Sequence, residues 1–154
     1  MYFVSSIIEK NVVLGDNTNV WYFSHICTKV RIGIDCNIGE KSYIGRGVLI
    51  GDNVRIGNNV NIYEGAIIKD NVRIGNGTCF TNVRKVSPTK KAEKLLDTII
   101  EEGAIVGANV TIVGGIKIGK NARIADGSVV TRNIPDGVWA NGNPARIKIR
   151  KENE

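Results

Sequence analysis

The chain has 154 residues, a formal net charge of +6 and 42% apolar residues, with 18 glycines and three prolines. This composition is typical of one globular domain, and it excludes a disordered chain and a collagen-like one. A positive balance suits anionic partners such as phosphates, nucleic acid or a membrane surface. Nucleic-acid binding has no support beyond the charge, because aromatic residues make up only 6% and form no stacking stripe.

Targeting signals and cysteine usage indicate the cellular compartment in which the protein works. No run of 18 apolar residues is present, so we expect no transmembrane helix. The start, Met1-Tyr2-Phe3-Val4, lacks a basic region followed by a long apolar core, so we expect no signal peptide. The cysteines are odd in number and do not follow a metal-ligand spacing: Cys27, Cys36 and Cys79. We therefore expect free thiols in a reducing cytoplasm and no metal.

An apolar residue recurs every six positions through the first half of the chain. Thirteen consecutive positions of this series are apolar: Ile8, Leu14, Val20, Ile26, Ile32, Ile38, Ile44, Ile50, Ile56, Ile62, Ile68, Ile74 and Phe80. Chance would give such a series on the order of once in a hundred thousand, so the period is structural. The residue two positions earlier is mostly small or β-branched, as at Val12, Thr18 and Ser24.

The hexad has a direct structural interpretation. Residues two apart on a strand face the same side, so both repeat positions point inward. The Gly and the Asp or Asn that often follow, as in Gly51-Asp52-Asn53, are expected at corners that need positive φ or locally bonded side chains. Three hexads make a triangular coil of 18 residues, and successive coils pair as parallel strands about 4.8 Å apart. The predicted fold is an all-β parallel β-helix.

The repeat is interrupted once and then ends. It stops after Phe80 and resumes at Ile100, a step that is not a multiple of six. We therefore expect residues 83–97 to leave the coil as an excursion, and a long loop in a compact solenoid is usually functional. The pattern ends at Ile134-Pro135, which predicts a β-helix over residues 1–135 and a C-terminal tail over residues 136–154.

Three features of residues 8–146 resemble the hexapeptide-repeat acyltransferases. The first is the hexad itself, in which Ile-Gly recurs. The second is the closing segment from Ile134 to Arg146, with its Gly-Asn-Pro-Ala-Arg ending. The third is narrower and resembles the subgroup that N-acetylates nucleotide-linked 3-amino sugars: Trp21-Tyr22-Phe23-Ser24-His25-Ile26, Phe80-Thr81-Asn82-Val83 and Gly107-Ala108-Asn109-Val110-Thr111-Ile112-Val113.

The resemblance implies more than the periodicity does. It implies a left-handed coil, although parallel crossovers are otherwise right-handed in about 98% of cases. It implies a homotrimer with acetyl-CoA bound in a groove between neighbouring subunits. The implied reaction is acetyl transfer from acetyl-CoA to the amine of a UDP- or dTDP-linked amino sugar, in the cytoplasmic synthesis of surface polysaccharide such as lipopolysaccharide.

Stacking at 18-residue intervals predicts where the site lies. Subtracting 18 repeatedly from Asn82 gives the column Glu64, Arg46 and Thr28, and adding 18 to His25 gives Tyr43, Asn61 and Cys79. Asn82, Glu64, Tyr63 and Asn61 should therefore cluster where the excursion begins. A loop that leaves a coil creates a natural ligand site.

The resemblance assigns Asn82 to orienting the attacking amine, while a turn residue that caps the loop exit is the alternative. Glu64 is expected to accept a proton or bind the ammonium group, or else to form a surface ion pair with Arg46. We count both as catalytic. Strong base catalysis is not required, because the departing thiolate can take the proton and positioning supplies much of the acceleration.

His25 is the single histidine, and in several acyltransferases of this superfamily a histidine is the general base. It lies three coils below Asn82, about 14–15 Å away at the strand spacing. A base must reach its proton within about 3 Å or through one water. We therefore expect substrate binding from His25, together with Tyr43, Asn61, Tyr63 and Arg84. A trimer-interface role or catalysis on a neighbour stays open.

Small residues late in the repeat are expected to bind the CoA arm: Gly107, Ala108, Gly114, Gly115 and Ala125. They offer small side chains and accessible backbone amides, and the amide of Gly114 or Gly115 is our candidate for an oxyanion donor. Arg146 and Lys148 suit the phosphates of CoA, unless they belong to a solvated basic tail.

Three other functions are alternatives. O-acetylation of a sugar or of serine uses the same fold. A non-catalytic β-solenoid scaffold belongs to another class, but it would need neither the excursion nor the basic tail. A β-helical zinc carbonic anhydrase requires three histidine ligands, which a single histidine per chain does not supply.

Overall fold

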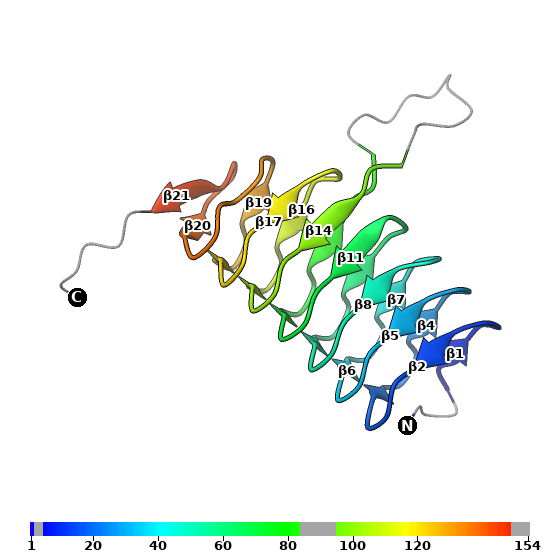
Figure 1. Ribbon diagram of the computed structural model, residues 1–154. Helices are drawn as coiled ribbons and strands as arrows, with labels where there is room; N and C mark the ends of the chain where they lie inside the picture. Colours follow the sequence, from blue (N-terminus) through cyan, green and yellow to red (C-terminus); the bar gives the residue numbers. More distant parts are fainter. Residues whose placement is uncertain (2–4, 84–94, 149–154) are drawn as a thin grey trace, which may run out of the picture.

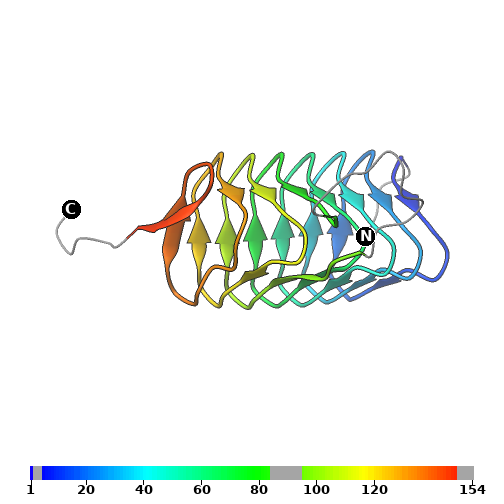
Figure 2. The same cartoon turned by 90° about the horizontal axis from the view of Figure 1, so that it is seen from above.

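The protein is described here by a computed structural model that covers residues 1, 5–83 and 95–148. The chain winds as a left-handed parallel β-helix of about seven turns, with three short strands in each full turn (Figure 1). β1 and β21 lie at opposite ends of the stack, and the strands of one sheet run side by side along it (Figure 2). No helix in the described part of the chain is of a kind that could cross a membrane.

Three sheets form the sides of the prism, and their strands are parallel except for the last one of the third sheet. The first sheet stacks β1 (Ile7–Ile8), β4 (His25–Ile26), β7 (Tyr43–Ile44), β10 (Asn61–Ile62), β13 (Cys79–Phe80), β16 (Thr111–Ile112) and β19 (Val129–Val130). The second sheet stacks β2 (Val13–Leu14), β5 (Arg31–Ile32), β8 (Leu49–Ile50), β11 (Ala66–Ile68), β14 (Thr98–Ile100) and β17 (Lys117–Ile118). The third sheet stacks β3 (Asn19–Val20), β6 (Asn37–Ile38), β9 (Arg55–Ile56), β12 (Arg73–Ile74), β15 (Ile105–Val106), β18 (Arg123–Ile124), β20 (Trp139–Asn141) and β21 (Arg146–Lys148).

The register confirms the predicted coil of 18 residues. Ile26 lies beside Ile44, and Ile44 lies beside Ile62, in successive turns of the first sheet. The same interval relates Ile50 to Ile68 in the second sheet and Ile38 to Ile56 in the third. The apolar hexad residues therefore form columns inside the prism.

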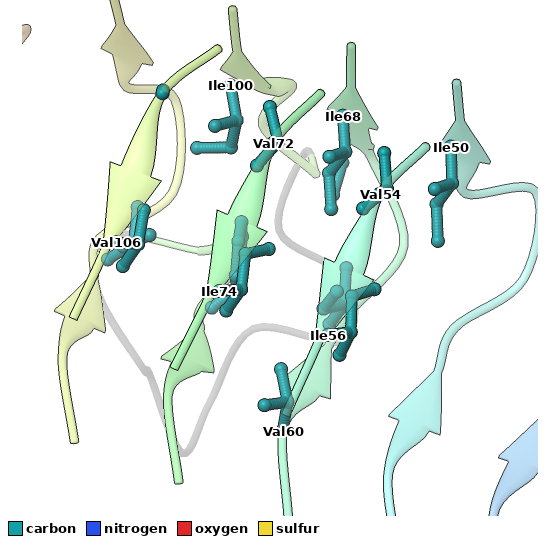
Figure 3. Close-up of a cluster of buried hydrophobic side chains, with 14 of the residues drawn as sticks. Ile50, Val54, Ile56, Val60, Ile68, Val72, Ile74, Ile100 and Val106 are labelled. Carbon is teal, nitrogen blue, oxygen red and sulfur yellow. The ribbon is translucent and has the colours of Figure 1, made fainter. Parts of the chain in front are cut away.

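The core consists of these stacked isoleucines and of the small or β-branched residues that precede them. Ile56, Ile68 and Ile74 are all at most 3% exposed, and they point into the prism from the second and third sheets (Figure 3). Val54, Val60 and Val72 fill the space at the corners and are fully buried. Burial of about 25 cal/mol per Å² of apolar surface stabilises this stack, which no single turn would provide.

The corners correct one detail of the sequence interpretation. The glycine that follows the isoleucine is needed because the next coil approaches closely: a Cβ on Gly15 would lie 2.4 Å from the carbonyl carbon of Gly33. Positive φ falls two residues later instead, at Asn17 (57°) and Asn53 (53°). The aspartates bond to the coil below rather than to their own turn, since Asp52 Oδ1 accepts from the Ile34 amide at 2.9 Å.

The chain leaves the coil at the corner between the first and second sheets. Ala66 lies beside Thr98 and Cys79 beside Thr111, so the register partners are 32 residues apart instead of 18. The amide of Leu96 donates to the carbonyl oxygen of Asn82 at 3.0 Å and closes the base of the excursion. Residues 84–94, in the middle of the predicted 83–97 excursion, lie outside the described residues.

The third sheet extends beyond the point where the hexad pattern ends. Ile124 lies beside Ala140, so β20 continues the parallel ladder after Pro135, and Ala140 is fully buried. β21 then turns back and pairs antiparallel with β20. The described part of the predicted tail, residues 136–148, thus covers the last turn of the prism.

Candidate functional site

A groove runs along the corner between the first and second sheets. Its cavity volume is about 390 Å³, and it is lined by Glu9, His25, Cys27, Tyr43, Gly45, Arg46, Tyr63, Glu64 and Asn82. These residues come from successive turns, because residues 18 apart lie one above another at this corner. The groove therefore follows the prism axis over five turns, from Glu9 to Asn82, and the level of His25 lies about 14 Å from that of Asn82.

Two side chains that the sequence analysis counted as catalytic lie at the upper end of this groove. Asn82 is half-buried, and its side-chain amide has no hydrogen-bond partner within the described part of the chain. Gly114 covers it in the next turn, where a Cβ would lie 2.9 Å from the Asn82 carbonyl carbon. Glu64 is exposed one turn below Asn82. The structure thus brings together an amide and a carboxylate at the excursion base.

Arg46 carries a positive charge into the middle of the same groove. The sequence analysis offered an ion pair between Arg46 and Glu64, but no such pair forms among residues 1, 5–83 and 95–148. Arg46 is exposed, and its charge helps to lower the pKa of Glu9 only as a minor contribution. The guanidinium is therefore available to an anionic ligand.

His25 is held by a carboxylate at the lower end of the groove. Its Nε2 lies 2.8 Å from Glu9 Oε1, while Glu9 Oε2 accepts from the Thr28 amide at 2.8 Å. The hydrogen bond with His25, followed by that with the Thr28 amide, lowers the pKa of Glu9. Because Nε2 is already engaged and three turns separate His25 from Asn82, the geometry gives His25 no direct path to a proton beside Asn82.

Aromatic rings form the wall between the two ends. The ring of His25 meets Tyr43 edge-on at 5.6 Å between centroids, and Tyr43 meets Tyr63 at 5.5 Å. The Cys27 thiol lies beside this stack, 3.9 Å from His25 Nε2. Hydrogen bonding with Cys27, and then burial, raises the pKa of Tyr43 to about 12. The phenol of Tyr43 is therefore a neutral donor at ordinary pH.

Two side chains of the groove, and the backbone of Gly45, were missed by the sequence analysis. Glu9 and Cys27 belong to the column that contains Tyr63, because successive subtraction of 18 from Tyr63 gives Gly45, Cys27 and Glu9. The 18-residue period therefore also predicts that Glu9 and Cys27 lie in the groove, but the sequence analysis used it only for the columns of Asn82 and His25. Asn61 lies beside Tyr43 in the first sheet yet does not line the groove. Arg84 lies outside the described residues.

The residues expected to bind CoA occupy two different corners. Gly107, Ala108 and Ala125 follow β15 and β18 at the corner between the third and first sheets. Gly114 and Gly115 follow β16 at the groove corner. One chain therefore does not bring all five together.

The expectation that these backbone amides are open to a ligand is wrong. The amide of Gly114 donates to Thr81 Oγ1 at 3.0 Å, and that of Gly115 donates to Thr98 Oγ1 at 3.1 Å. At the other corner the amides bond to the next turn, as in the donation from Ala108 to Asp126 Oδ1 at 2.8 Å. The stacking that defines the fold uses these donors, so neither Gly114 nor Gly115 presents an idle oxyanion donor.

Arg146 and Lys148 extend from β21 at the end of the third sheet, and both are exposed. They make no ion pair among the described residues. The Arg146 guanidinium donates to the carbonyl oxygen of Ala145 at 3.1 Å. The end of the prism thus presents two cations on one short strand, far along the axis from His25.

Sequence comparison matches the repeat directly. The family model described as "Bacterial transferase hexapeptide (six repeats)" matches residues 47–82 and 97–132, and the "Hexapeptide repeat of succinyl-transferase" model matches residues 29–64. Together they cover more than half of the chain. A dTDP-3-amino-3,6-dideoxy-α-D-galactopyranose 3-N-acetyltransferase from Aneurinibacillus thermoaerophilus is 59% identical over 51 residues, which are 33% of this chain and 27% of that protein. The chain thus spans about a third or less of the length of the curated relatives it matches.

Solved structures share the fold. A hexapeptide-repeat acetyltransferase from Vibrio cholerae, solved with acetyl-CoA, has a TM-score of 0.61 and 29% identity over 76% of this chain and 71% of that one. The GDP-perosamine N-acetyltransferase of Caulobacter crescentus, solved with CoA and GDP-perosamine, has a TM-score of 0.52 and 21% identity over 96% of this chain and 55% of that one. With its 18-residue coil, recurring hexads and two repeat matches, the chain belongs to the hexapeptide-repeat acyltransferase family.

Proposed function

We propose that this chain is an acetyl-CoA-dependent N-acetyltransferase that acts on the amine of a nucleotide-linked amino sugar. The observation that carries the proposal is the groove in which the amide of Asn82, without a hydrogen-bond partner among the described residues, lies at the base of the excursion, one turn above Glu64. The 59% identity of one segment to a dTDP-amino-sugar N-acetyltransferase supports the substrate class. The Vibrio structure with acetyl-CoA supports the donor.

The reaction needs a held amine more than it needs a strong base. The amine nitrogen attacks the thioester carbonyl carbon, the carbon–sulfur bond then breaks, and the departing thiolate takes up the proton that the nitrogen releases. In this proposal the Asn82 side-chain oxygen accepts a hydrogen bond from the amine and directs its lone pair. Orientation of this kind accounts for several kcal/mol of the barrier, roughly 7–11 kcal/mol in well-aligned cases.

The charges of the groove suit a substrate with both an ammonium and a phosphate group. Glu64 binds the ammonium form and accepts the proton that must be lost before attack. Arg46 lies one turn lower, without an ion-pair partner among the described residues, and matches the diphosphate of a nucleotide-linked sugar. Tyr43, Tyr63 and His25 then offer ring faces and edges to the remaining part of the substrate.

We further propose a homotrimer in which a neighbour completes the acetyl-CoA site. One chain places its small residues at two corners, with Gly114 at the groove and Gly107 at the next corner. A neighbouring chain packed along the groove would bring its own corner of small side chains opposite Asn82. The second sheet begins at the groove corner, and its exposed or half-buried apolar residues would be covered in this assembly: Leu49, Ile67 and Ile99.

Arg146 and Lys148 are proposed to contact the phosphates of CoA from the end of the prism, since both cations are exposed. The free thiols of Cys27, Cys36 and Cys79 are compatible with a reducing compartment, which supports a cytoplasmic enzyme. Synthesis of surface polysaccharide is the process that consumes N-acetylated nucleotide sugars of this kind.

A thiol-release assay with acetyl-CoA tests the reaction. The panel should hold UDP-, dTDP- and GDP-linked amino sugars, with serine and plain sugars as hydroxyl acceptors. We expect release of CoA only with an amino sugar. Release with hydroxyl acceptors alone would replace the proposal by O-acetylation, and no release with any acceptor would favour a scaffold.

A matched pair of variants tests the site. We expect Asn82→Ala to lower turnover at least tenfold while sedimentation still shows the assembly of the unchanged protein. Asn19→Ala removes an asparagine of the third sheet, away from the groove, and should leave turnover unchanged. Equal activity of the two variants would remove Asn82 from the site.

A further inference from the structure

We propose that Glu9, His25 and Cys27 form a binding site for a divalent transition-metal ion, with Zn²⁺ as the best match. One ligand atom of each residue converges on the same point: the carboxylate oxygen, the imidazole nitrogen and the thiol sulfur lie within 4.8 Å of one another. His25 Nε2 is 2.8 Å from Glu9 Oε1 and 3.9 Å from Cys27 Sγ. All three side chains line the lower end of the groove.

Three interatomic distances must change before the site can hold an ion. Zn²⁺ binds nitrogen and oxygen at about 2.0–2.2 Å and sulfur at about 2.3 Å, so tetrahedral ligand atoms lie roughly 3.3–3.6 Å apart. The nitrogen and the oxygen would have to separate by about 0.5 Å, and the sulfur would have to approach the nitrogen by about 0.4 Å. The carboxylate oxygen and the sulfur lie at most 4.8 Å apart and would have to approach by up to about 1.2 Å. Rotation of the Glu9 and Cys27 side chains would have to supply these movements.

Contacts around the three ligands already hold them in place. Glu9 Oε2 accepts from the Thr28 amide at 2.8 Å, which leaves Oε1 pointing at His25. Tyr43 meets the edge of the His25 ring and also interacts with the Cys27 thiol. Such outer contacts orient ligands and raise the affinity of metal sites. Cys27 is 7% exposed, so its sulfur is shielded on every side except the groove.

The donor set determines the class of ion. A thiolate and an imidazole favour Zn²⁺, Co²⁺ or Cu⁺ over Mg²⁺ and Ca²⁺, which prefer oxygen ligands. The charges of the Glu9 carboxylate and the Cys27 thiolate would balance the two positive charges of Zn²⁺. Three protein ligands leave a fourth position that opens onto the groove, where water or a ligand can bind.

The site shares only His25 with the groove residues to which the proposed transfer reaction gives a role. Neither Cys27 nor Glu9 has a role in that reaction, and acetyl transfer of the kind described above uses no metal. Glu9 comes from the first turn, whereas His25 and Cys27 come from the second. An ion held here would therefore tie the first turn of the prism to the second and close the lower end of the groove.

Spectroscopy of the metal-free protein titrated with Co²⁺ tests the site without any substrate. We expect one Co²⁺ per chain, with a thiolate-to-cobalt absorption band and the visible bands of a four-coordinate ion. Zn²⁺ should displace it and remove both signals. Because the thiol must lose its proton, binding should tighten as the pH rises.

Two cysteine variants separate this site from chance binding to thiols. Cys27→Ser should abolish the thiolate band and weaken Co²⁺ binding at least a hundredfold, and Glu9→Gln should weaken it at least tenfold. Cys79→Ser removes the half-buried thiol of β13 and should bind as the unchanged protein does. The proposal is overturned by absence of the thiolate band in the unchanged protein, by its persistence in Cys27→Ser, or by its loss in Cys79→Ser.

Discussion

Substitution of one glycine at the groove corner should damage both stability and activity. A Cβ on Gly45 would lie 2.7 Å from the Glu64 amide nitrogen and 3.0 Å from the Tyr63 carbonyl carbon. Ordinary contact begins at 3.4 Å, so Gly45→Ala must push the next turn outward by about 0.7 Å at Glu64. Overpacking of this size costs about 1–3 kcal/mol of folding free energy.

The displaced segment is the one that carries groove residues. A shift approaching 1 Å at Glu64 and Tyr63 should lower turnover by up to about a hundredfold, because reacting groups tolerate little misplacement. The fold should survive, since domains have about 5–15 kcal/mol of stability. Urea denaturation measures the first effect, and thiol release from acetyl-CoA at a temperature where the variant is fully folded measures the second.

Gly57→Ala is the matched control. Its Cβ would lie 2.2 Å from the side-chain oxygen of Asn76 and 2.8 Å from the Asn76 amide nitrogen, at a corner outside the groove. It should lose a similar amount of stability, about 1–3 kcal/mol, and keep its turnover. A stable and fully active Gly45→Ala variant, or an equal loss of turnover in both variants, would refute the link between coil spacing and the site.

Three further outcomes follow from single side chains. Phe23 has a φ of 61° and Asn59 occupies the same position two turns later, so Phe23→Asn should stabilise the fold by about 0.5–1 kcal/mol in urea denaturation, whereas Tyr22→Asn should not. The pKa of Glu9 is lowered from 4.5, mainly by the His25 hydrogen bond, so the stabilisation from Glu9 is present above pH 4.5 and disappears as the pH falls through the folded-state value. The difference in melting temperature between the unchanged protein and Glu9→Gln should shrink in that range. A difference that stays constant with pH would contradict the pairing. The pKa of Tyr43 is raised from 10.0 to about 12, so the folded state loses stability as the pH rises from 10 to 12; an absorbance titration should show a late tyrosine that is missing in Tyr43→Phe.

The periodicity of the sequence predicted the fold because each hexad contains both an inward-facing residue and a corner. Ile44 and Ile62 lie beside each other as the 18-residue coil requires. Glycine at the corners was assigned the wrong reason, since the clash at Gly15 arises between turns and is invisible within one hexad. Handedness came from the family resemblance, because general chain sterics favour the opposite hand.

The candidate site was predicted in part, for the same geometric reason. Asn82 and Glu64 were placed together because simple subtraction relates them, and the groove contains both. Glu9 was missed although the same subtraction from Tyr63 reaches it. Whether Gly114 offers an idle amide could not be predicted, because its bond to Thr81 Oγ1 depends on a side-chain rotamer in another turn.

The excursion also shows how this architecture accommodates new sequence. Ala66 and Thr98 pair as neighbours although 14 additional residues separate them beyond one coil, and the turns above keep their alignment. Corners therefore tolerate insertion, whereas sides of the prism do not, because a strand slip of one residue would turn every core isoleucine outward. Families built on this scaffold can change their chemistry by lengthening a corner while the stacked turns stay as they are.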